Sequence, residues 1–124
     1  MRPNDDLAET IRAAYTQADL AQFGDLLADD VRWGDDDHPN RCRTRDDVLR
    51  TFATWIGEGV TAEVIDVESG PFGVSCHVRV RWSKQADRAR GVDFFHVLLI
   101  RDGLIREIRR FDEAESATRA ISSG

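Results

Sequence analysis

The chain has 124 residues, of which 41% are hydrophobic and 32% charged, which suits one domain with a real core and is too short for two. No apolar run is long enough to span a bilayer, and the excess of 23 acidic over 17 basic residues argues against binding to a nucleic-acid backbone. We therefore expect one soluble domain, residues 1–124, with a single site.

Three amphipathic helices are predicted in the first half of the chain. Residues 4–17 place apolar side chains at helical spacing behind acidic residues, which favour a helix N-terminus. Asp19 can cap a second, shorter helix that stops near Asp29-Asp30. Thr44 can cap a third, whose apolar positions have three-and-four spacing and which ends at Gly57.

A brief strand, Val31 to Trp33, is expected between the second and third helices. Gly34 and three aspartates end it, and a polar loop follows up to Arg43. The two cysteines, Cys42 in this loop and Cys76 further on, have neither a CxxC nor a zinc-site spacing. We expect free thiols, with Cys76 in the core.

From Val60 onward the hydrophobic period changes from 3.6 to 2, which predicts strands. In the second of them, polar and apolar residues alternate, so one face packs and the other meets water or a partner. Turn signals at Gly70-Pro71, near 86–90 and at Asp102-Gly103 separate the strands and predict an antiparallel meander. The four strand candidates are residues 61–69, 73–83, 91–101 and 104–112.

The third of these strands is apolar on both faces, with Phe94 and Leu98 on one side and Phe95 and Val97 on the other. Helices can cover only one face of a short sheet in a chain of this size. We therefore expect a second subunit to cover the other face.

Three helices, a short strand after the second and then a curved sheet predict an α+β cone. The segments ADLAQFGDLLADDVRWGD (18–35), RTRDDVLRTF (43–52) and RGVDFFHVLLIRDGLIREIRRFDE (90–113) resemble the SnoaL-like proteins. Those proteins belong to the nuclear transport factor two-like superfamily, with ketosteroid isomerase, scytalone dehydratase and limonene epoxide hydrolase. The resemblance implies a cone-shaped curved antiparallel sheet packed against three helices, with a pocket between them.

The resemblance also implies positions for catalytic groups. Asp35 takes the place of the general base of ketosteroid isomerase, and His96 takes the place of its protonated aspartate. Ile11 takes the place of its donor tyrosine, although Tyr15 lies one helical turn later and could point the same way. Neither donor of the isomerase is therefore present as such.

Other members of the superfamily suggest different chemistry. Arg110 stands where the SnoaL-type polyketide cyclases have an acid. Asp35, Arg110 and Asp112 could imitate the Asp-Arg-Asp set of the epoxide hydrolases if all three face inward. That condition depends on a bulge near Glu107, which would shift the set of side chains that faces inward.

The resemblance implies a pocket lining that is mostly aromatic, which is usual for a small-molecule site. The alternative is that the same side chains fill the chamber as core. The expected lining and substrate-binding residues are Tyr15, Phe23, Trp33, Phe52, Trp55, Trp82, Phe94, His96, Leu98 and Ile108, together with Arg110.

His96 is the sharpest single candidate, since it sits in an apolar strand and imidazole can exchange protons near neutral pH. The alternative is a neutral core histidine bonded to Tyr15 or a carboxylate. A carboxylate of Asp35 at the rim of an apolar cavity would have a raised pKa, which suits a general base. Its alternative is a solvated turn residue.

The acidic run DDDH (35–38) could also be read as a metal site built from Asp35, Asp37 and His38. No other cluster of recognised spacing supports that interpretation, and no cofactor is expected. Asp36, Asp37 and His38 are most simply turn residues. On the outer face of the sheet, cross-strand ion pairs are expected between basic and acidic side chains; the candidates are Arg79, Arg81, Arg101, Arg106 and Arg109 with Glu63, Asp66, Glu68 and Glu107.

The function predicted from these patterns is binding of a small, largely apolar or polycyclic molecule in an internal pocket. It would extend to acid–base chemistry, an isomerisation, cyclisation or water addition, with Asp35 as base and His96 as donor or acid. A homodimer through the outer face of the sheet is expected, with no nucleic-acid or membrane partner. The N-terminal MRPNDDL lacks the apolar core of a secretory signal, so a cytoplasmic protein is expected. The competing hypothesis is a non-catalytic binding or interaction module.

Overall fold

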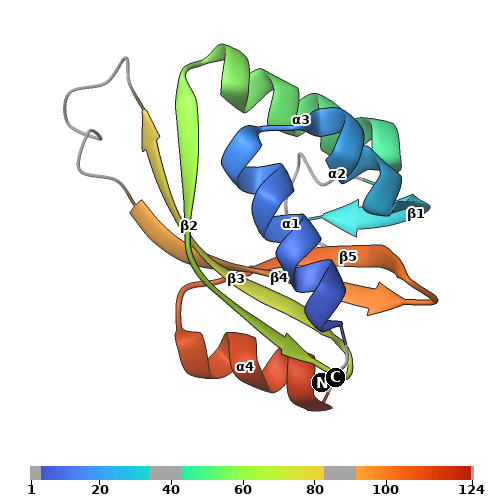
Figure 1. The fold of residues 1–124 in the computed structure, drawn as a ribbon. Coiled ribbons are helices and arrows are strands. Elements are labelled where there is room, and N and C mark those ends of the chain that lie inside the picture. The colour runs from blue at the N-terminus through green and yellow to red at the C-terminus, as the bar shows by residue number, and fades with distance from the viewer. Residues whose placement is uncertain (1–3, 34–42, 83–91, 124) are drawn as a thin grey trace.

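A computed structural model describes residues 4–33, 43–82 and 92–123, with Trp82 and Ser123 described by their backbone only. The sheet has five strands in the order β1-β5-β4-β3-β2. In chain order the elements are α1 (Asp5–Gln17), α2 (Leu20–Leu26), β1 (Leu27–Trp33), α3 (Arg45–Gly57), β2 (Val60–Gly70), β3 (Gly73–Trp82), β4 (Val92–Arg101), β5 (Leu104–Phe111) and α4 (Ala114–Ser123). Figure 1 shows the curved sheet with α1, α2 and α3 on one face and α4 on the other. The predicted α+β fold is confirmed.

The helix boundaries follow from the predicted capping residues. The Asp19 side chain accepts a hydrogen bond from the Gln22 backbone N–H at 3.0 Å, and Thr44 accepts one from the Asp47 N–H at 3.2 Å. Each bond satisfies a backbone donor that the first turn of a helix leaves free. Between α1 and α2, Ala18 adopts a left-handed conformation with φ of 53°, which makes the very short joint that the sequence indicated.

The second helix ends earlier than predicted, at Leu26 rather than near Asp29-Asp30. The residues that follow belong to β1, where Leu27 pairs with Ile105 of β5 and Trp33 pairs with Ile108. The pairing of β1 with β5 is parallel, so the sheet is mixed and the expectation of a wholly antiparallel sheet is wrong. Local pattern cannot reveal this, because the partner strand lies more than 70 residues away in the chain.

The four later strands form the predicted antiparallel meander. The register between β4 and β5 shifts so that Arg106 is an extra residue next to Glu107, where a bulge was considered. Beyond it, Ile108 pairs with Leu98 and Arg110 pairs with His96. Paired residues lie on the same face of a sheet, so Arg110 shares the inner face with His96.

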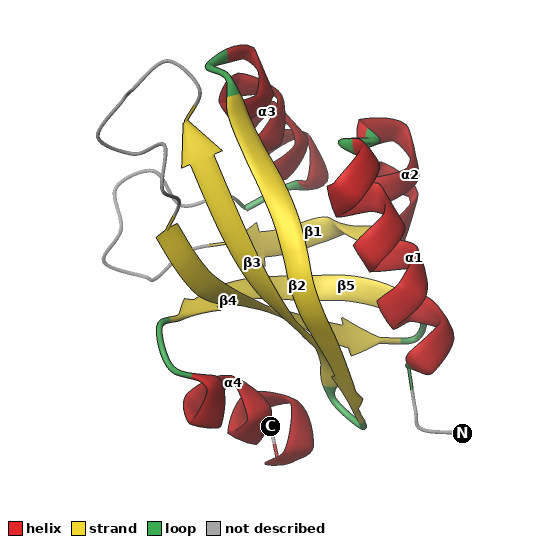
Figure 2. Cartoon of the chain, turned by 60° about the vertical axis from the view of Figure 1, so that its left-hand side comes forward, coloured by secondary structure: helices red, strands yellow, loops and turns green. Residues whose placement is uncertain are grey.

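A fourth helix was not predicted, and it corrects the expectation of three helices. Val97 of β4 packs against Ala117 and Ile121 of α4, and all three are fully buried. Figure 2 shows α4 lying across the face of the sheet opposite to α1, α2 and α3. The second apolar face of β4 is therefore covered at least in part by the chain itself, and the argument that only a second subunit could cover it was wrong.

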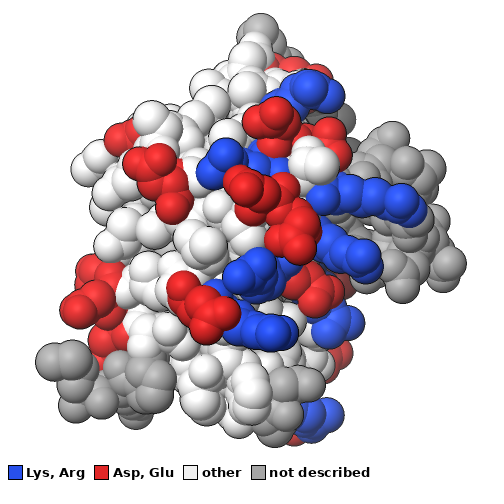
Figure 3. Space-filling model, turned by 90° about the vertical axis from the view of Figure 1, so that its right-hand side faces the viewer, with Lys and Arg blue, Asp and Glu red and all other residues white. Residues whose placement is uncertain are grey.

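Outside α4, the outer face carries cross-strand ion pairs, of which Arg81 with Glu63 was expected and Arg79 with Asp93 was not. Arg81 lies 3.4 Å from Glu63, and Arg79 lies 2.7 Å from Asp93. Around the edge strand β1, Asp29 pairs with Arg45 at 3.1 Å and Asp30 pairs with Arg106 at 3.4 Å. Figure 3, viewed from the right-hand side of Figure 1, shows both charges mixed over that surface. Charged side chains of this kind discourage pairing of an exposed edge with another chain.

Candidate functional site

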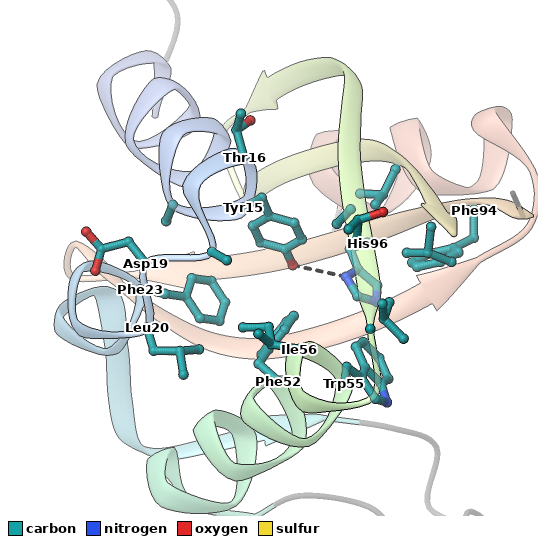
Figure 4. A pocket seen from close by; sticks show the side chains of 18 residues that line it. Tyr15, Thr16, Asp19, Leu20, Phe23, Phe52, Trp55, Ile56, Phe94 and His96 are labelled. Carbon is teal, nitrogen blue, oxygen red and sulfur yellow. Dashed lines mark hydrogen bonds between the residues drawn. The ribbon is translucent and has the colours of Figure 1, made fainter. Parts of the chain in front are cut away.

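A cavity of about 310 Å³ lies between the inner face of the sheet and the three N-terminal helices. Figure 4 shows its lining from close by. The lining residues are Ala14, Tyr15, Thr16, Ala18, Asp19, Leu20, Phe23, Phe52, Trp55, Ile56, Gly59, Val60, Thr61, Ala62, Val78, Val80, Phe94 and His96.

The lining passes from buried to exposed residues. Tyr15 and His96 belong to the buried part, whereas Ala18, Ile56 and Thr61 are exposed. The exposed members come from the joint between α1 and α2, the end of α3 and the start of β2. The cavity therefore opens to solvent between these segments, where Thr16, Asp19 and Thr61 lie, and has Tyr15 and His96 at its closed end.

A hydrogen-bonded pair forms the polar part of the closed end. The Tyr15 hydroxyl lies 3.0 Å from Nδ1 of His96, and Figure 4 shows the two groups pointing at each other. Tyr15 is 8% exposed and His96 is 2% exposed. Tyr15 comes from the last turn of α1 and His96 from the middle of β4. The pair therefore joins the helical layer to the sheet across the core.

Burial keeps both members of the pair neutral. Together with a smaller effect of the positive charge of Arg110, it lowers the pKa of His96 from 6.5 to about 3. Burial also raises the pKa of the Tyr15 hydroxyl, with a smaller contribution from Cys76. A charged form would lose its hydration in this apolar surrounding, which is why the neutral forms prevail. Near pH 7 the pair consists of an uncharged phenol and an uncharged imidazole.

Aromatic rings surround the pair. His96 lies 4.7 Å from Phe94 and 5.5 Å from Trp33, measured between ring centroids. Trp33 in turn stacks on Phe52 at 5.0 Å and meets Trp55 edge to face at 5.1 Å. Such packed rings bury much apolar surface and hold the wall of the cavity rigid.

Five of the predicted substrate-binding or catalytic residues line the cavity, namely Tyr15, Phe52, Trp55, Phe94 and His96. Phe23, also expected in the lining, is there too. Trp33, Leu98 and Ile108 are buried in the core and do not belong to the lining of this cavity.

Arg110 lies beside the site rather than in its lining. Its guanidinium stands over the Phe94 ring at 4.6 Å from the centroid and 3.5 Å from the Asp112 carboxylate. Its side chain is 55% exposed. Asp35 and the side chain of Trp82 lie outside the described residues, as do Asp36, Asp37, His38 and Cys42.

Several lining residues were missed by the sequence analysis. Asp19, Leu20 and Ile56 lie at helix ends, where the helical pattern does not indicate which side chains face a cavity. Val78 and Val80 could have been found, because the alternation in β3 places them on the packed face. Asp19 uses its carboxylate to cap α2, so this acidic lining residue already has a structural role.

Cys76 is a buried free thiol next to the site, as predicted. Burial raises its pKa to about 12, against a smaller opposing effect of Arg12. The thiol is therefore protonated at neutral pH and behaves as a small apolar core group.

Within residues 4–33, 43–82 and 92–123, no group of three or more His, Cys, Asp or Glu side chains could hold a metal ion. The acidic run considered as a metal site lies outside these ranges. Over the same ranges, no helix is both long enough and apolar enough to cross a membrane.

The fold is that of the nuclear transport factor two-like proteins. The SnoaL-like domain matches the sequence over residues 8–108, and the chain belongs to this family. A search among curated proteins found no match.

Solved structures support the fold. A proposed ketosteroid isomerase from Kribbella flavida is 21% identical, with a TM-score of 0.69, over 86% of this chain and 74% of its own. An NTF2-like protein of unknown function from Cytophaga hutchinsonii is 7% identical, with a TM-score of 0.68, over 95% and 96%. An LEH-like epoxide hydrolase from M. tuberculosis is 15% identical, with a TM-score of 0.61, over 91% and 80%. At these identities the similarity concerns the fold alone.

Proposed function

We propose that the chain binds a small, uncharged, largely apolar molecule in this cavity, with the Tyr15–His96 pair as its polar contact. The observation that carries the proposal is the hydrogen-bonded, neutral pair at the closed end of a largely apolar cavity. Cavities that bind small molecules are mostly apolar, with a few polar groups that fix the orientation of the ligand.

The size and charge of the lining restrict the ligand. The volume of about 310 Å³ lies at the lower end of the range of roughly 300–1,000 Å³ that is typical of ligand pockets. Among the described lining residues, Asp19 is the one formally charged side chain, and it caps α2. A carboxylate or phosphate would find no cationic partner among these described lining residues, whereas a neutral molecule of one to three rings suits them.

Acid–base chemistry is the enzymatic extension of this proposal. Asp35 would take a proton next to a carbonyl group, the electron pair would move to the carbonyl oxygen, and His96 would hold that oxygen by a hydrogen bond. The neutral state of His96 supports a role as donor rather than as an imidazolium acid. By their names, two proteins of similar fold are a proposed ketosteroid isomerase and an epoxide hydrolase, and isomerisation and water addition are among the reactions that the sequence predicted.

Binding without catalysis is the second candidate. One observation favours it, since the single carboxylate among the described lining residues already serves as a helix cap. The two candidates therefore differ on whether Asp35 acts at the site.

Thermal stabilisation by ligands tests binding. We expect neutral bicyclic and polycyclic ketones, alcohols and terpenoids to raise the melting temperature of the wild type. Ala62→Phe, in the lining, should abolish the effect by filling the cavity. Ala53→Phe introduces the same side chain at an exposed position of α3 outside the lining and should keep it. Equal stabilisation of both variants would contradict binding in the cavity.

Exchange of hydrogen for deuterium tests catalysis. A ketone such as 1-indanone in D2O should exchange the hydrogens next to its carbonyl faster with the protein than with buffer, as measured by NMR. Asp35→Asn should remove the acceleration and Asp37→Asn should keep it. Exchange no faster than in buffer, together with tight binding, would support a non-catalytic binding protein.

A homodimer through the outer face of the sheet is also proposed. The ion pairs on this face carry both charges, which suits contact with a second copy of the same surface. Because α4 already covers part of the face, the interface would lie over β2 and β3. Sedimentation velocity measures the mass directly, and a monomer at micromolar concentration would contradict this proposal. A cytoplasmic location stays a prediction from the sequence.

A further inference from the structure

The two ring nitrogens of His96 have different surroundings. Nδ1 faces the Tyr15 hydroxyl at 3.0 Å, and Figure 4 shows the other nitrogen on the ring edge away from that hydroxyl. Among the described residues Nε2 has no hydrogen-bond partner, and its aromatic neighbours Phe94 and Trp33 accept hydrogen bonds only weakly.

His96 lines the cavity although the residue is only 2% exposed. Its Nδ1 is occupied by the Tyr15 hydroxyl. Nε2 is therefore the ring nitrogen through which His96 can meet a ligand in the cavity.

The direction of the buried hydrogen bond decides which nitrogen carries the hydrogen. A neutral phenol has one hydrogen to donate, and within the described residues its only partner is Nδ1 of His96. If Nδ1 carried the hydrogen of the imidazole, the Tyr15 hydrogen would have no protein acceptor among the described residues, which is costly in a largely buried group. Tyr15 therefore donates, Nδ1 accepts, and a neutral imidazole then carries its hydrogen on Nε2.

We propose that Tyr15 fixes His96 as a hydrogen-bond donor into the cavity, so that the site selects neutral ligands with an accessible acceptor oxygen. Ketones, epoxides and ethers belong to this class, whereas molecules that can only donate a hydrogen bond do not. This inference rests on the proposed function and names its ligand class. In it, Tyr15 is a positioning residue that acts through His96.

Selective ¹⁵N labelling of histidine tests the first step on the wild-type protein. The cross-peaks between ring nitrogens and ring carbon-bound hydrogens distinguish the two tautomers, and the spectrum of His96→Gln identifies the signals that belong to His96. We expect a hydrogen on Nε2 and an unprotonated Nδ1 at pH 7. A hydrogen on Nδ1 would overturn the inference without reference to any variant.

Three bicyclic probes of similar shape test the selection. Indane has neither donor nor acceptor, 1-indanone has only an acceptor, and indole has only an N–H donor. By calorimetry we expect 1-indanone to bind about two- to tenfold more tightly than indane, which corresponds to one net hydrogen bond. Indole should bind no more tightly than indane.

The Tyr15→Phe variant separates positioning from packing. Without the hydroxyl, His96 can place its hydrogen on either nitrogen, so the ratio of the 1-indanone and indole affinities should fall toward one. Thr54→Val removes a hydroxyl from an exposed position of α3 outside the lining and should keep the wild-type ratio.

The outcomes separate this inference from the proposed function. If the three probes bind equally well, or indole binds best, the cavity is a binding site but the selection by acceptor is wrong. If Tyr15→Phe folds and keeps the wild-type ratio, Tyr15 does not set the tautomer. If no probe binds to the wild type, the proposed function itself fails, and the ligand class fails with it.

Discussion

On the inner face of the sheet His96 lies among aromatic rings and is 2% exposed, whereas three residues earlier on the same strand the Asp93 side chain is 39% exposed on the outer face. Both groups have a lowered pKa, but the causes differ. Burial disfavours the charge on His96, while hydrogen bonds from Arg79 favour the charge on Asp93. On the inner face, His96 is therefore neutral, whereas on the outer face Asp93 keeps its charge in an ion pair that solvent reaches.

This difference explains the distribution of function and stability over the molecule. The neutral His96 and the aromatic side chains of the inner face suit an uncharged ligand, so the proposed binding site lies on that face. Charges on the outer face keep the exposed strands hydrated and add little to stability, because solvent screens exposed pairs. Four measurements test this difference between the two faces of the sheet.

The largest expected effect is the loss of an inner-face side chain. Ile108 is fully buried, so Ile108→Ala should reduce the free energy of unfolding by about 2–5 kcal/mol through lost burial and a residual cavity. Urea denaturation measures it. Ile65→Ala, at a side chain that is 38% exposed, is the matched control and should cost much less. Equal losses would mean that the inner face is not the main core.

The same truncation under α4 should cost less. Ile121 is fully buried, but the cluster around it contains only two other fully buried residues, Val97 and Ala117. We expect Ile121→Ala to lower the free energy of unfolding by about 2 kcal/mol, the lower end for such changes. The exposed Ser122→Ala on the same helix should leave it unchanged. If Ile121→Ala lowered the free energy of unfolding as much as Ile108→Ala does, packing under α4 would contribute as much to stability as the inner core.

The pH dependence of stability tests the neutral state of His96. Its pKa is about 3 in the folded chain and 6.5 ordinarily, so between these values the unfolded chain binds the extra proton. Stability from this group is therefore complete above pH 6.5 and is lost as the pH falls, by about 1.4 kcal/mol per pH unit within the window. His96→Gln should flatten that part of the stability curve between pH 6.5 and 4.5.

A second variant separates the two causes of this low pKa. Burial is the larger cause and the charge of Arg110 the smaller, so Arg110→Gln should keep most of the slope. Loss of the slope in Arg110→Gln would show that charge, rather than burial, keeps His96 neutral.

The smallest effect is expected on the outer face. Asp93→Asn removes the carboxylate that Arg79 and His77 contact, but all three side chains are partly exposed. In the monomer, water can replace the lost partner, so the melting temperature should change by little more than the experimental error, and less still at high salt. A large, salt-independent loss would contradict a solvated outer face and would mean that the pair is buried, as it would be in the proposed dimer interface.

Much of the fold could be predicted because its signals are local. The caps at Asp19 and Thr44 and the alternation in β3 all follow from neighbouring residues. Helix α4 was not predicted, although Ala117 and Ile121 stand four residues apart on its buried side and its amphipathic pattern is pronounced. The pairing of β1 with β5 was missed because it joins distant segments.

The candidate site was predicted in part for the same reason. The sequence indicated His96 by its place in an apolar strand. It also named Tyr15, one helical turn after Ile11 in the first helix, as a possible hydrogen-bond partner of His96. It could not separate lining from core among the aromatic residues, since Trp33 and Trp55 have similar patterns and only Trp55 borders the cavity.

The sequence by itself therefore determined the SnoaL-like fold, the helix caps and the two faces of the central strands, because these depend on the chemistry of adjacent residues. Only the tertiary structure decided that Tyr15 and His96 meet, that both are neutral, and that α4 covers the outer side of β4. The physical reason is that protonation and packing depend on neighbours in space. Tyr15 and His96 are 81 positions apart in the chain, and only the packing of α1 on the sheet brings them within 3.0 Å.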